Sequence, residues 1–69
     1  MGYSPTKEIS NGQKVFVNKN APKPLRYITR DADAHNGGVW KAAKSFKALG
    51  SRTTRSGTYS RWLNIRMGG

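Results

Sequence analysis

Two of the chain's three acidic residues lie within five positions of its only histidine. They are Asp31 and Asp33, which precede His35 at every second position. In an extended segment, side chains at this spacing project from one face, so the three groups would form a single acid–base cluster. Such a cluster fits RNA cleavage, in which a base takes the ribose 2′-hydroxyl proton, an acid protonates the leaving 5′-oxygen and cations stabilise the phosphate.

Histidine suits the acid role because its unperturbed pKa lies nearest neutrality, and a neighbouring carboxylate favours its protonated form. We therefore predict that one of Asp31 and Asp33 is the base and that the other orients His35, and which aspartate is the base is left open. Cations for the phosphate lie downstream. We assign Lys41 to the catalytic group, and three further cations to RNA phosphate binding, namely Lys44, Arg52 and Arg55.

The same residues allow other interpretations. Aspartates before a turn usually make local backbone hydrogen bonds, and residues 36–38 form an Asn-Gly-Gly turn signal. The Asp-x-Asp-x-His pattern also offers oxygen and imidazole ligands to a metal ion. It is not an EF-hand loop, since Asn36 and Ala42 stand where glycine and glutamate are needed. Because no third carboxylate lies nearby, we expect neither a metal nor another cofactor.

The whole chain is strongly basic. Its 69 residues hold 13 Lys and Arg against 3 Asp and Glu, which gives a net charge of +10. Such a balance favours nucleic acid, an anionic membrane or an acidic protein as partner. No apolar run approaches the ~18 residues that a membrane span needs, and we see no signal peptide. The chain has no cysteine, so neither a disulfide nor a thiolate zinc site supports its small core.

The length predicts one domain overall. Within it we divide residues 1–24, an N-terminal arm or helix with the first strand, from residues 25–69, the catalytic sheet. Residues 11–12 are the turn signal Asn-Gly, and the β-prone runs at 14–18 and 25–29 predict strands.

Residues 39–49 fit both a helical stripe and a strand alternation, so helix and strand stay open for this stretch. Four aromatic residues could stack on unpaired bases. They are Tyr27, Trp40, Tyr59 and Trp62. In so small a domain we expect each tryptophan in the core instead.

Three pieces of the sequence resemble the C-terminal toxin domains of bacterial polymorphic and contact-dependent growth inhibition systems. They are residues 31–41, 49–51 and 55–59, and the resemblance covers about residues 25–66. It is strongest to the ribosome-inactivating, colicin-type ribonuclease domains. The resemblance implies an α+β fold, a small twisted antiparallel sheet with a short N-terminal helix. It also implies that Asp31, Asp33 and His35 are the catalytic acids and histidine and that Lys41 is the lysine that follows.

The function implied by this resemblance is a metal-independent toxin ribonuclease that cleaves small-subunit (16S) ribosomal RNA near the decoding centre and blocks translation. Its partners would be the ribosome and an acidic cognate immunity protein, with the toxin a monomer or a heterodimer with that protein. It would be secreted or presented on the cell surface within a larger effector and act in the cytoplasm of the target bacterium. In the colicins an acid follows the catalytic histidine, whereas here Asn36 does.

Two other functions compete with this one. A toxin nuclease that cuts transfer RNA or DNA, with a metal ion in the DNA case, predicts that a chelator abolishes degradation of plasmid DNA. A non-catalytic RNA-binding module predicts salt-sensitive binding and no effect of Asp31→Ala on the integrity of the RNA. The clustered acids argue against the binding module. Carboxylates on an RNA-facing surface repel phosphates and weaken binding, so we expect them there only if they take part in catalysis.

Overall fold

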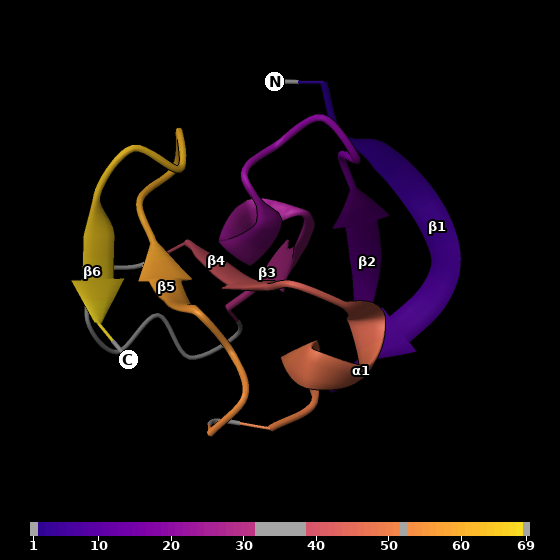
Figure 1. Cartoon of the computed structure of the whole chain (residues 1–69). Coiled ribbons are helices and arrows are strands. Elements are labelled where there is room, and N and C mark those ends of the chain that lie inside the picture. Colours follow the sequence, from indigo (N-terminus) through magenta and orange to yellow (C-terminus); the bar gives the residue numbers. More distant parts are fainter. Residues whose placement is uncertain (1, 32–38, 52, 69) are drawn as a thin grey trace.

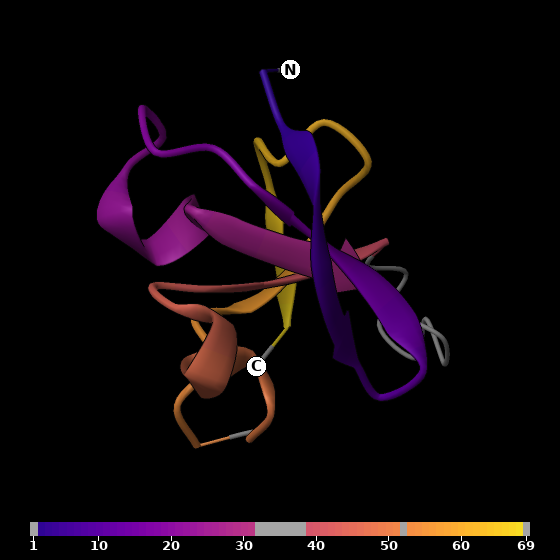
Figure 2. The same cartoon turned by 90° about the vertical axis from the view of Figure 1, so that its right-hand side faces the viewer.

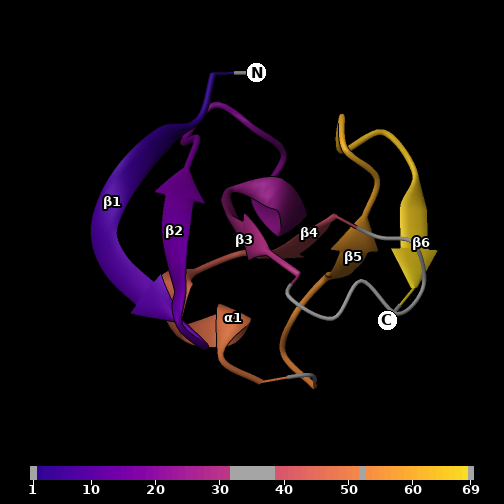
Figure 3. The ribbon, with the colours of Figure 1, turned by 180° about the vertical axis from the view of Figure 1, so that it is seen from behind.

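The computed structural model describes residues 2–31, 39–51 and 53–68. In this part of the chain, six antiparallel strands form one sheet in sequence order. The strands are β1 (Ser4–Ser10), β2 (Gln13–Val17), β3 (Tyr27–Arg30), β4 (Trp40–Ala43), β5 (Gly57–Tyr59) and β6 (Arg66–Gly68). Two short helical elements join them, the 3-10 helix η1 (Lys23–Leu25) and the α-helix α1 (Phe46–Leu49). β1 and β6 are the edges of the curved sheet (Figures 1 and 3).

The predicted α+β fold with a short N-terminal helix is wrong. The described chain is largely β, and its N-terminal residues form a hairpin of β1 and β2. Asn11 and Gly12 make the two-residue turn, with φ of 51° and 80°, and Ser10 pairs with Gln13. Positive φ at both central residues gives the turn a twist that matches paired strands. The polar segment before the turn is therefore a strand because it pairs with β2, not because of its own propensity.

The two helical elements cover opposite faces of the sheet, with η1 on one side of β4 and α1 on the other (Figures 1 and 2). On the opposite face from α1, Ile28 and Ala42 pair across β3 and β4 and are buried. The larger core lies under α1. It consists of Val15, Ala43, Ala48 and Leu49, with Tyr27 and Phe46 packed against it.

Residues 39–49 contain both a strand and a helix. The first part of this stretch, where apolar and polar residues alternate, forms β4. Ser45 then caps α1, and its Oγ accepts a hydrogen bond from the N–H of Ala48 at 3.1 Å. Serine is a preferred residue at this N-cap position because its oxygen satisfies a free N–H group of the first turn. No helix in the described residues is long and apolar enough to cross a membrane.

Gly57, the first residue of β5, has a backbone conformation that other residues rarely adopt. Its φ is +134°, and a Cβ atom there would lie 2.7 Å from the carbonyl oxygen of Gly68. We expect Gly57→Ala to lower the free energy of unfolding by about 2 kcal/mol, because backbone strain adds to a clash with β6. In a domain of this size, that loss corresponds to a fall in melting temperature of roughly 10 °C, measurable by circular dichroism.

Gly50→Ala is the matched control for this prediction. Gly50 has an ordinary φ of −73°, and a Cβ atom there would lie 3.5 Å from its nearest contact, the carbonyl oxygen of Lys47. We expect this variant to melt close to the wild type. Equal melting temperatures for the two alanine variants would show that β6 adjusts to a side chain at Gly57.

Candidate active site

β3 and β4 bring Asp31 and Lys41 together. The N–H of Asp31 donates to the carbonyl of Val39 at 2.8 Å, so pairing continues past the end of β3. Thr29 is the cross-strand partner of Lys41, and side chains two residues apart on a strand share a face. Asp31 therefore lies on the face of Lys41, and its Oδ1 is 3.9 Å from the Nζ of that lysine.

Both charged groups are largely removed from water. The side chain of Asp31 is 8% exposed and that of Lys41 is 14% exposed. At 3.9 Å the contact is a charge pair rather than a hydrogen bond of normal length. The desolvation of two charges offsets much of their attraction, so such a pair adds little net stability.

Two buried threonines flank Lys41 as its cross-strand neighbours, Thr29 in β3 and Thr58 in β5. The Oγ1 of Thr29 donates to the carbonyl of Lys14 at 2.9 Å. Within the described residues, the Oγ1 of Thr58 has no hydrogen-bond partner. This hydroxyl is closed to solvent, so it lies in the packed interior beside Lys41 rather than on a surface that a substrate could reach. The sequence did not indicate that Thr58 is buried beside Lys41, because a threonine in a β-prone run carries no signal of its own.

One of the predicted phosphate-binding residues, Lys44, lies away from this pair. Lys44 is exposed just beyond β4, about 10 Å along the strand direction from Lys41. It lines a hollow of about 430 Å³ together with Lys23, and a second hollow of about 330 Å³ together with Lys47. Arg55 is half-buried in the loop that precedes β5. Lys44 therefore belongs to a separate basic surface rather than to the Asp31–Lys41 pair.

Three of the predicted site residues, Asp33, His35 and Arg52, lie outside the described residues. Within residues 2–31, 39–51 and 53–68, no three His, Cys, Asp or Glu side chains gather into a group that could hold a metal ion. The described part of the site therefore consists of Asp31, which follows β3, and Lys41, which lies in β4.

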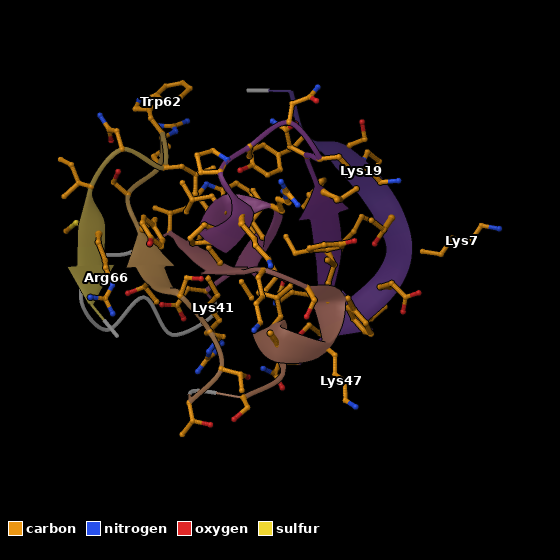
Figure 4. The ribbon with its side chains drawn as sticks, in the orientation of Figure 1. Lys7, Lys19, Lys41, Lys47, Trp62 and Arg66 are labelled. Carbon is orange, nitrogen blue, oxygen red and sulfur yellow. The ribbon has the colours of Figure 1, made fainter. Side chains whose placement is uncertain are left out.

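The two tryptophans, both expected in the core, differ in their surroundings. Trp40 is half-buried, packs edge-on against Phe16 with ring centroids 5.9 Å apart, and donates from Nε1 to the carbonyl of Arg61 at 3.0 Å. Trp62 is 68% exposed in the connection between β5 and β6. The core prediction is wrong for Trp62, because this connection lies at the edge of the sheet (Figure 4).

The fold and the site define a small, strongly basic, largely β domain with a nearly buried carboxylate–ammonium pair at the end of β3. The model of one protein family, Novel toxin 21 (Ntox21), matches residues 1–69, so the chain belongs to this family of toxins. This match supports the polymorphic-toxin part of the resemblance. No curated protein and no solved structure matches the chain. The similarity to colicin ribonucleases stays a prediction.

Proposed function

We propose that this toxin domain is an endoribonuclease that cleaves small-subunit ribosomal RNA by metal-independent acid–base catalysis. One observation carries the proposal: the nearly buried carboxylate of Asp31 lies 3.9 Å from the ammonium of Lys41. A carboxylate can accept the proton of a ribose 2′-hydroxyl, and an ammonium can stabilise charge on the phosphate. The pair therefore combines two of the functions that RNA cleavage needs, at the end of the strand that leads into the remaining predicted residues.

In the proposed mechanism, one of Asp31 and Asp33 takes the 2′-hydroxyl proton while the 2′-oxygen forms a bond to phosphorus. His35, oriented by the other aspartate, protonates the 5′-oxygen as its bond to phosphorus breaks. Lys41 stabilises the negative charge that builds up on the phosphate oxygens.

The basic hollows beside Lys44 support binding of the RNA backbone. Lys23 and Lys44 line one hollow, and Lys47 shares the next one with Lys44. Amines that share a hollow repel each other, and a bound phosphate relieves this repulsion. In this proposal Arg52 and Arg55, from the loop before β5, extend the phosphate contacts. Because several cations would contact phosphates, we expect binding to weaken steeply as salt is raised.

Delivery and protection follow from toxin-family membership and from charge. We propose that the domain enters a target bacterium as part of a larger effector and acts in its cytoplasm. A producing cell would then need an inhibitor. A chain with a net charge of +10 is best covered by a strongly acidic immunity protein, which would associate fast and in a salt-sensitive way.

The proposal is tested by incubating the purified domain with intact ribosomes, total transfer RNA and plasmid DNA, each with and without EDTA. We expect one fragment released from small-subunit ribosomal RNA, unchanged by EDTA and absent with the His35→Ala variant. Cut transfer RNA beside intact ribosomal RNA would overturn the target. EDTA-sensitive cleavage of DNA would overturn the metal-independent ribonuclease. Binding of RNA without any cleavage would favour the non-catalytic module.

A further inference from the structure

A cleft of about 510 Å³ lies on the part of the sheet formed by β3, β4 and the β5–β6 connection. It is lined by Arg30, Val39, Trp40, Arg61 and Trp62. Its volume falls within the range of sites that bind small ligands. The lining, as far as the structure describes the chain, carries two guanidinium groups and no carboxylate. The cleft is therefore suited to an anionic ligand with a flat apolar part.

This cleft is distinct from the Asp31–Lys41 pair. Arg30 and Trp40 are cross-strand partners in β3 and β4, and each stands next in sequence to a member of that pair. Since successive side chains of a strand alternate between faces, the Arg30 and Trp40 side chains lie on the opposite face of the sheet. In Figure 4, Trp62 of the cleft lies at the top of the view and Lys41 lower.

The two tryptophans of the cleft are held differently. Trp40 forms a fixed wall, because Phe16 packs against its ring and its Nε1 donates to the carbonyl of Arg61. The guanidinium carbon of Arg30 lies 5.6 Å from the centre of the Trp40 ring. Trp62 is instead 68% exposed, with the guanidinium carbon of Arg61 5.7 Å from its ring centre. Its ring is therefore available for stacking, and a cation is already in place beside it.

We infer that this cleft binds one unpaired nucleotide of RNA, with the base stacked on Trp62 and the adjoining phosphates bound by Arg30 and Arg61. Single-stranded nucleic acid is bound in this way elsewhere, by exposed aromatic rings interleaved with cations. Charge favours an anionic occupant, since the described lining adds two cations and no acid to a chain of net charge +10, and the exposed Trp62 ring favours a nucleotide because a base can stack on it. The choice of RNA rests on the proposed function, which the site deepens by adding selection for unpaired segments.

The test uses a fluorescent 2′-O-methyl RNA of about eight nucleotides, a length within the range of single-strand sites. This RNA lacks the free 2′-hydroxyl and cannot be cleaved by the proposed mechanism. Binding is followed by anisotropy for the single strand and for the same sequence in a duplex. We expect Trp62→Ala to weaken single-strand binding roughly tenfold to hundredfold, Trp62→Phe to retain most of the affinity, and duplex binding to change little. Arg61→Gln should reduce the salt dependence by about one phosphate contact.

Ile65→Ala is the matched control, because Ile65 is 57% exposed in the same β5–β6 connection and does not line the cleft. Equal losses in Ile65→Ala and Trp62→Ala would overturn the inference, as would single-strand binding by Trp62→Ala within about twofold of the wild type. Unchanged RNA binding with lost binding of an acidic protein would assign the cleft to that protein instead. Since the probe is not cleaved, Trp62-dependent binding beside intact ribosomal RNA would refute the nuclease and retain this site.

Discussion

Asp31→Asn is expected to lower the rate of RNA cleavage by about 10²–10⁴-fold, the contribution of a positioned general acid–base group. Asparagine keeps the shape of the side chain but cannot accept a proton or orient a histidine through a negative charge. Both roles open to Asp31 in the mechanism are therefore lost. The measurement is the initial rate of fragment release from ribosomes at saturating enzyme, compared with the wild type.

Glu8→Gln is the control for this variant, because it makes the same change of charge at an exposed position of β1. We expect it to cleave within about twofold of the wild type, since exposed charges away from the site contribute little. Wild-type cleavage by Asp31→Asn, with His35→Ala inactive, would assign both the base and the orienting role to other residues.

Lys41→Met is expected to lower the rate of the chemical step by about 10²–10³-fold, with a smaller effect on KM. Methionine is nearly as long and flexible as lysine but carries no charge, so the variant removes the cation that stabilises the transition state. Lys7→Met is the control. Lys7 is exposed on β1 and projects away from the molecule on the far side from Arg66 in Figure 4. We expect Lys7→Met to weaken RNA binding slightly, with the cleavage rate unchanged.

Stability separates catalysis from a purely structural role of the pair. Each single variant removes one charge of a largely buried pair and with it the attraction between Asp31 and Lys41, which costs up to about 3 kcal/mol of folding free energy. The double variant Asp31→Asn, Lys41→Met carries neither charge, so we expect its melting temperature to recover toward that of the wild type. Cleavage should stay lost. Recovery of cleavage together with stability would show that the pair only supports the fold.

The candidate site was partly predictable from the sequence. Asp31 and Lys41 were both chosen for their chemistry. Their contact was not predictable from spacing, because it depends on the pairing of Thr29 with Lys41. Lys44 was assigned to the same substrate, but it lies beyond the far end of β4, beside Lys23 and Lys47. Closeness in sequence does not show at which end of a strand a cation lies, and therefore which site it can contribute to.

The N-terminal hairpin and the exposure of Trp62 show a second limit of prediction. The Asn11-Gly12 turn was recognised, yet the polar segment before it was predicted as an arm or helix, and this segment has little β propensity of its own. Pairing with β2 outweighed that propensity. Trp62 was predicted in the core because large aromatic rings usually are buried. It is exposed because β5 ends before it and β6 begins after it, which leaves it in the connection between the two strands.

By itself the sequence determined the strong positive charge, the Asn11-Gly12 turn and the resemblance to polymorphic toxins, because these depend on residue type and local spacing. The tertiary structure alone decided three other features: the pairing of Asp31 with Lys41, the burial of Thr58 beside them, and the Trp62 cleft on the opposite face. Each of these depends on the register of strands that are distant in sequence. A shift of one residue in the register of β4, for example, would move Lys41 away from the face of Asp31 and Thr58.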